Sequence, residues 1–150
     1  MRYLIGIVIS LFCFVPSVSA ENGLVNVKSA HGVKDTADRL EAGVKEKGMN
    51  VFNRIDHAAG AAKVGEKLRP MELLIFGSPV VGTKLIKCSQ TTGIDLPLKA
   101  LIWEDGKGTV WLTYTDPKYL ENRHAITGCG EVLKKVEAML GTLAQAAAAP

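Results

Sequence analysis

The chain has 150 residues, of which 47% are hydrophobic, 22% charged and 6% aromatic. This length allows one domain, and the balance of charged and apolar residues excludes a disordered or fibrous protein. Arg2 is the only basic residue before position 21, so 17 of the 18 basic groups and all 15 acidic groups lie beyond it, a net charge of +2. So small an excess of positive charge argues against a nucleic-acid partner.

The first 20 residues have the pattern of a secretory signal peptide. Arg2 precedes an apolar run from Leu4 to Val15, and small residues end the segment at Ala20. The run is about 12 residues long, which is shorter than the ~20 that a membrane-spanning helix needs. The sequence therefore predicts cleavage at about Ala20 and a periplasmic or secreted protein with no permanent membrane span. An uncleaved membrane anchor is the alternative.

Strand and helix patterns alternate through the rest of the chain. Runs rich in β-branched and apolar residues predict strands, at 24–28, 49–55, 71–77, 98–104 and 109–115. Apolar residues at helical spacing predict helices, at 33–48, 58–65, from Pro79 onward, from Pro117 onward, and through Val132 to Leu143. Residues 144–150 are Ala-rich and are expected to form a disordered tail.

These elements predict an α/β fold, in the sense of an α+β sandwich, that forms a single domain over residues 21–143. The expected core is a mixed sheet of about five strands with helices packed on it. The Asp105–Gly108 turn joins the last two strands as a hairpin, so at least that pair is antiparallel. Gly48 suits the left-handed turn that ends the first helix.

Export also affects the interpretation of the cysteines. Cys13 leaves with the signal peptide, so Cys88 and Cys129 remain in an oxidising compartment. A disulfide between them would close a loop of 41 residues, the difference between 129 and 88. Two free or buried thiols are the alternative, because spacing alone does not show whether the two sulfur atoms can meet.

The sequence lacks the short motifs of nucleotide-binding proteins, zinc proteases and serine hydrolases. Ligand sites in α/β folds tend to form beyond the ends of strands, and polar residues gather there in this chain. The ligand-binding candidates are Asp56, His57, Arg69, Glu72, Tyr114, Arg123 and His124. Of these, His57, Arg69 and His124 are expected to border one small-ligand cleft. We expect no cofactor and no metal, since His57, His124 and Cys129 lack a strong ligand spacing.

Four segments resemble the DUF302 family: Asn53–Ala62, Leu68–Pro79, Gly93–Asp105 and Trp111–Leu120, followed by Arg123 and His124. The resemblance covers nearly all of residues 23–143 in the right order. It implies a compact α/β domain that tends to form homodimers. It implies no particular activity, and it assigns no role to the polar positions.

Three functions are compatible with these observations. We favour an exported small-ligand-binding or sensing domain of unknown ligand. A small periplasmic enzyme or redox factor is an alternative, in which Asp56 orients His57 as a base or Cys129 acts as a thiol. The other alternative is a structural dimeric interaction module, with Trp103 and Trp111 on its surface.

Overall fold

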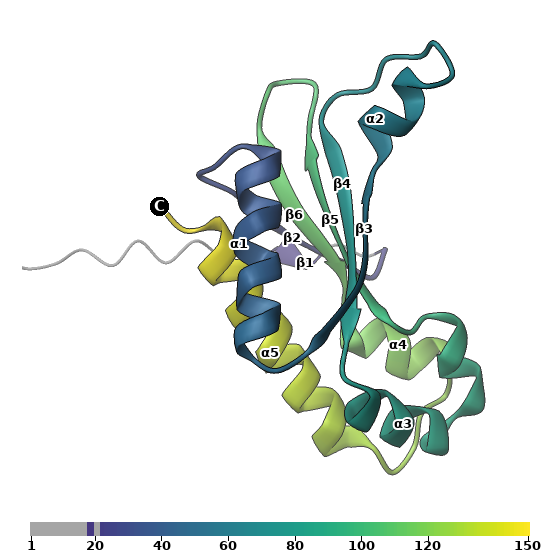
Figure 1. The fold of residues 1–150 in the computed structure, drawn as a ribbon. Helices are drawn as coiled ribbons and strands as arrows, with labels where there is room; N and C mark the ends of the chain where they lie inside the picture. The colour runs from purple at the N-terminus through teal and green to yellow at the C-terminus, as the bar shows by residue number, and fades with distance from the viewer. Residues whose placement is uncertain (1–17, 20–21) are drawn as a thin grey trace, which may run out of the picture.

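The computed structural model describes residues 18–19 and 22–150, which form one domain with helices packed on a sheet (Figure 1). Most of the predicted signal peptide, including Cys13, lies outside the described residues. Its cleavage therefore stays a prediction. Among the helices of the described part, none has the length and hydropathy needed to cross a membrane.

The strands are β1 (Val18–Ser19), β2 (Leu24–Lys28), β3 (Asn50–Asp56), β4 (Met71–Gly77), β5 (Leu98–Glu104) and β6 (Val110–Thr115). The helices are α1 (Val33–Glu46), α2 (His57–Ala62), α3 (Pro79–Cys88), the 3-10 helix η1 (Gln90–Ile94), α4 (Pro117–Arg123) and α5 (Gly130–Ala148). The five strands predicted from the sequence are all present, displaced by at most one residue. The short β1 adds an edge to them.

The sheet has the order β1-β2-β6-β5-β4-β3, and every described strand pair is antiparallel. The expectation of a single α+β domain is therefore confirmed, while the expectation of mixed strand directions is wrong. The reason lies in the connections. The segments from β3 to β4 and from β4 to β5 return each strand beside the previous one in the opposite direction, although each segment contains a helix.

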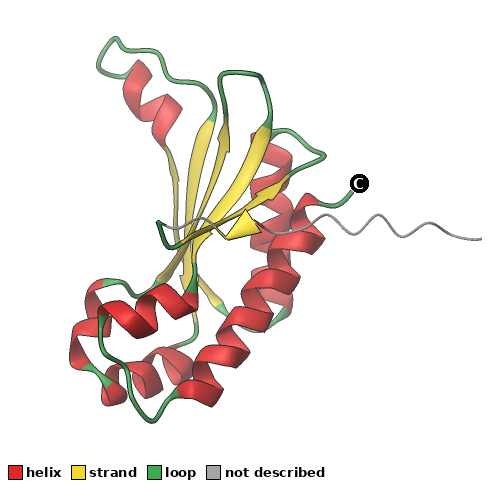
Figure 2. Ribbon diagram, turned by 180° about the vertical axis from the view of Figure 1, so that it is seen from behind, coloured by secondary structure: helices red, strands yellow, loops and turns green. Residues whose placement is uncertain are grey.

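Helices α1 and α5 cover one face of the sheet, and in both views none of the described helices lies over the centre of the opposite face (Figures 1 and 2). The predicted apolar stripe of α1 is buried against the sheet, with Leu40 and Val44 in the same core as Phe76 and Ile102. Gly48 has a φ of 69°, the left-handed conformation that suits glycine at the end of a helix.

The C-terminal segment is helical, and the expected disordered tail at 144–150 is wrong through residue 148. Helix α5 continues to Ala148, and Ala144, Ala147 and Ala148 are buried in the main core. The Ala30 amide donates a hydrogen bond to the Ala148 carbonyl at 2.9 Å. Alanine has the highest helix propensity, and its small side chain lets this end of α5 approach the sheet closely.

Candidate functional site

The seven ligand-binding candidates lie in three different places. Four of them lie where β3 ends and β4 begins: Asp56, His57, Arg69 and Glu72. Arg123 and His124 lie at the end of α4, near the opposite end of the sheet (Figure 1). Tyr114 is 7% exposed and lies in the core, where burial raises the pKa of its hydroxyl.

The expectation of one cleft bordered by His57, Arg69 and His124 is therefore wrong. Its physical reason is the antiparallel pairing of β5 and β6, in which Glu104 faces Val110. β6 starts at the end of the sheet where β3 ends, and it runs to the opposite end. Helix α4, which follows β6, therefore lies at the end of the sheet away from His57 and Arg69.

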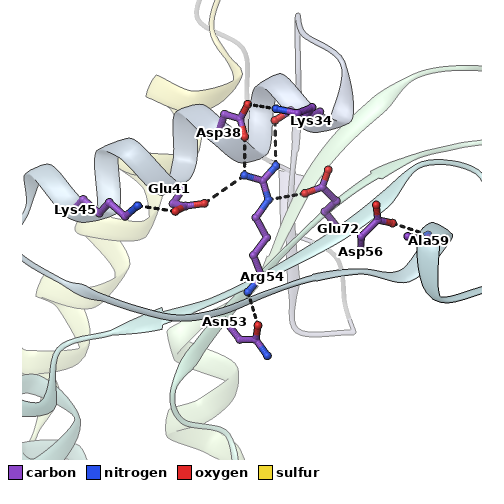
Figure 3. A network of polar contacts seen from close by, with 9 residues as sticks. All are labelled: Lys34, Asp38, Glu41, Lys45, Asn53, Arg54, Asp56, Ala59 and Glu72. Carbon is purple, nitrogen blue, oxygen red and sulfur yellow. Dashed lines mark hydrogen bonds and ion pairs between the residues drawn. The ribbon is translucent and has the colours of Figure 1, made fainter.

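Glu72 belongs to an ion-pair network centred on Arg54, a residue absent from the sequence-based candidates. Arg54 Nε donates to Glu72 Oε2 at 2.5 Å, and its Nη1 donates to Asp38 Oδ1 at 2.5 Å and to Glu41 Oε2 at 3.2 Å (Figure 3). The guanidinium thus joins β3 and β4 to α1. These contacts make Glu72 a structural residue.

The network shifts the pKa values of Arg54, Asp38 and Glu41 in the directions expected for opposite charges in contact. The hydrogen bond to Glu72 is the main cause that raises the pKa of Arg54. The pKa of Asp38 is lowered first by Lys34 and then by Arg54, while that of Glu41 is lowered mainly by Lys45 with help from Arg54. All three carboxyl groups are thus held near a positive charge.

The remaining candidates at this end do not form a catalytic arrangement. Asp56 Oδ1 accepts a hydrogen bond from the Ala59 amide at 2.8 Å and so caps α2 (Figure 3). The half-buried His57 ring has no polar partner among the described side chains and backbone groups. Arg69 is exposed and donates from Nε to the Glu104 carbonyl at 3.1 Å. The Asp56 carboxylate therefore caps a helix and does not orient the His57 ring.

At the opposite end, His124 connects α4 to η1 from a buried position. Its Nδ1 lies 3.0 Å from Thr91 Oγ1, and its Nε2 lies 2.5 Å from Asp95 Oδ2. Arg123 Nε is 3.5 Å from the same carboxylate oxygen, and Ser89 Oγ donates to the His124 carbonyl at 2.9 Å. Sequence reasoning missed Thr91 and Asp95 because both lie in a segment of ordinary turn residues.

The order hydroxyl, imidazole, carboxylate also occurs in nucleophilic enzymes, but its surroundings here favour a structural role. The His124 side chain is only 5% exposed. Asp95 lines a cavity of about 230 Å³, but neither Thr91 nor His124 lines it or the two cavities bordered by α3. The cluster fixes α4 against η1.

We expect a His124→Phe variant to lose about 2 kcal/mol of unfolding free energy, because Asp95 loses a buried hydrogen-bond partner. Urea unfolding followed by circular dichroism measures the loss. Arg123→Gln is the control, and its exposed ion pair predicts a loss below about 0.5 kcal/mol. Equal midpoints for His124→Phe and the wild type would contradict the structural role.

A cavity of about 290 Å³ lies between α3, η1 and the adjoining ends of β4 and β5. Most of its lining is apolar, and no Asp or Glu contributes to it. Two of its lining residues, Phe52 and Ile86, are 52% and 37% exposed, so the cavity opens to solvent. This site could not be predicted from the sequence, because its residues come from separate segments that meet only in the folded chain.

Gly82 and Gly93 contribute to the lining of this cavity. A Cβ atom on Gly82 would lie 3.7 Å from Leu96 Cδ1, and one on Gly93 would lie 4.0 Å from Ile86 Cδ1. Both are ordinary van der Waals distances, so Ala fits at either position. A longer side chain at Gly82 would extend into the cavity.

Cys88 and Cys129 form a disulfide in the structure, with their Cα atoms 6.3 Å apart. The bond joins the last residue of α3 to the N-cap residue of α5. Cys129 is 6% exposed, so its sulfur is both bonded and buried. Within the described residues, no group of three His, Cys, Asp or Glu side chains is placed to hold a metal ion.

The fold and the cavity define a small α+β protein with an antiparallel sheet. Its structure is similar to the crystal structure of an uncharacterized conserved protein DUF302 from Bacillus stearothermophilus, with a TM-score of 0.75 and 20% identity. That match covers 83% of this chain and 98% of the other, and it concerns the fold alone. The sequence model for the domain of unknown function DUF302 matches residues 25–143. The chain belongs to this family.

Curated relatives share a closer sequence match. Fluoride-specific ion channel FluC 1 of Brucella suis biovar 1 (strain 1330) is 47% identical over 129 residues, which is 85% of this chain and 51% of the relative. Fluoride-specific ion channel FluC 2 of Brucella melitensis biotype 1 has the same identity over 129 residues, 48% of its length. The chain thus spans about half the length of these relatives.

Proposed function

We propose that this protein binds a small, largely apolar organic molecule in the cavity between α3, η1 and the sheet, and that it does so in the periplasm or outside the cell. The apolar cavity of about 290 Å³ is the observation that carries the proposal. Small-molecule sites are typically apolar hollows of roughly 300–1,000 Å³, so this one suits a ligand at the small end of the range.

The chemistry of the lining selects the ligand class. A largely apolar wall favours a hydrocarbon or aromatic body through the area removed from water. The names of the curated relatives give fluoride as their ion, and those proteins are about twice as long as the matched region. Fluoride is small and strongly hydrated. An apolar wall does not replace its hydration. The Cys88–Cys129 bond supports the proposed location, since disulfides persist in oxidising compartments.

The test is a titration with N-phenyl-1-naphthylamine, a neutral dye whose fluorescence rises in apolar surroundings. We expect the wild type to bind it, and a Gly82→Leu variant to bind it at least about tenfold more weakly because the new side chain occupies the cavity. Gly82→Ala is the matched control and should bind like the wild type, given the 3.7 Å clearance to Leu96. A folded Gly82→Leu protein with unchanged dye affinity would refute this site.

A second candidate function rests on the uncovered face of the sheet. Side chains alternate between the faces of a strand, and Ile102 and Leu112 face the helices from buried positions. Leu101, Trp103 and Trp111 therefore point the other way and are half-buried, with the two tryptophans directly paired across β5 and β6. We propose that a second copy of the chain covers this face. Sedimentation showing a monomer at micromolar concentration would exclude the homodimer.

A further inference from the structure

We infer that the ligand is an amphipathic organic anion, such as a carboxylate on a compact apolar body, whose charged group is held by Lys47, Lys84 and Lys135. This inference rests on the proposed function and specifies the ligand class for the same site. It arises from a second hollow and from the charges around it.

The second cavity has a volume of about 390 Å³ and adjoins the apolar one. The two share part of their walls, namely Ser78, Val81, Leu98 and Val136. Further apolar side chains of the second cavity include Met49, Val132 and Met139. A ligand that reached from the first cavity into the second would thus contact the apolar side chains of Val81, Leu98 and Val136.

Three lysines from three different helical segments line this second cavity. Lys47 is the C-cap residue of α1, Lys84 lies in α3 and Lys135 lies in α5. None of the three has an ion-pair partner among the described residues, whereas their neighbour Lys134 pairs with Glu131 at 3.1 Å.

The lining of the second cavity, like that of the first, contains no Asp or Glu. Three lysines that line one hollow, with no carboxylate residue in its lining, produce a local positive potential that attracts anions. The fold gathers these charges from segments distant in sequence, and an anionic ligand would neutralise them.

The start of α3 adds to this potential. Ser78 lines both cavities and is the N-cap residue of α3, and its side chain makes no capping hydrogen bond. The first turn of a helix carries a partial positive charge, which favours a negative group nearby. The three lysines supply most of the positive potential, and the start of α3 adds to it.

The experiment compares two dyes that differ by one charged group. 8-Anilino-1-naphthalenesulfonate has the same ring system as N-phenyl-1-naphthylamine with an added sulfonate. We expect the wild type to bind the sulfonate more tightly than the neutral dye, and a Lys84→Ala/Lys135→Ala variant to bind the sulfonate about tenfold more weakly. The same variant should bind the neutral dye unchanged. Raising the salt concentration should weaken the binding of the sulfonate dye and leave the binding of the neutral dye unchanged.

The matched control is Lys87→Ala/Lys134→Ala. It also removes one lysine from α3 and one from α5, so net charge changes equally, but neither residue lines either of the two cavities. Equal weakening of the sulfonate by both double variants, or equal weakening of both dyes by Lys84→Ala/Lys135→Ala, would overturn the inference. Those outcomes would leave the proposal of an apolar binding cavity intact. That proposal is refuted only if the neutral dye does not bind, or if Gly82→Leu leaves the affinity for the neutral dye unchanged.

Discussion

Loss of the Cys88–Cys129 disulfide is expected to lower the free energy of unfolding by about 4 kcal/mol. The bond closes a 41-residue loop, and such a cross-link stabilises mainly by removing conformations from the unfolded chain. Urea unfolding of the wild type with and without dithiothreitol measures the effect. The same decrease should appear without reductant in a Cys88→Ala/Cys129→Ala variant.

The double variant also supplies the control, because reductant should not change its unfolding midpoint. A wild-type midpoint that is equal in both conditions would show that the bond contributes no stability. The expected loss is a large part of the ~5–15 kcal/mol that separates folded from unfolded states in most domains. A reduced protein should therefore unfold at much lower denaturant concentration.

Replacement of Arg54 by Met is expected to lower the free energy of unfolding by about 3 kcal/mol at pH 7. The variant leaves Glu72, which is 14% exposed, without its cation. Asp38 and Glu41 also lose their ion pairs with Arg54. Removing one partner of a mostly buried pair typically costs this much. Urea unfolding of the variant and the wild type gives the difference. Lys34→Met is the control, because its ion pair is 76% exposed on the lysine side and should contribute little to stability.

The effect of Arg54 also has a pH dependence of known sign. Because the folded-state pKa values of Asp38 and Glu41 are lowered, their contribution is complete above the ordinary carboxyl pKa of about 4 and disappears as pH falls through the folded values. Lys34 and Lys45 keep part of this shift in the variant. The stability difference between wild type and Arg54→Met should therefore shrink between pH 5 and pH 2. A difference that grows on acidification would contradict the role of the network.

The sequence predicted the elements well because their signals are local. The run Met71–Gly77 is apolar except for Glu72 and became β4 with the same limits, and Gly48 ended α1 as its lack of a side chain suggests. Strand direction was not predictable in this way, because pairing depends on how the connections return to the sheet. The Ala-rich end of α5 was misread since composition alone does not show that Ala144 meets a core.

The ion-pair network and the cavity were harder to predict from the sequence, because their residues are separated along the chain. Arg54 meets Asp38, Glu41 and Glu72 across 16, 13 and 18 residues, which no helix or strand period connects. The cavity combines Phe52 with residues of α3 and with Val136. His124 was among the sequence-based ligand candidates, but its partner Asp95 belongs to a turn without a motif.

The pairing of Val18 and Ser19 with β2 gives proteolytic processing a structural consequence. Cleavage after Ala20 would remove these two residues from beside Val25 and Asn26, and the main-chain groups of β2 that they cover would become a free border of the sheet. Such borders invite strand addition by other chains. A molecule without Val18 and Ser19 would thus present this part of β2 to other chains, whereas β1 covers it in the structure.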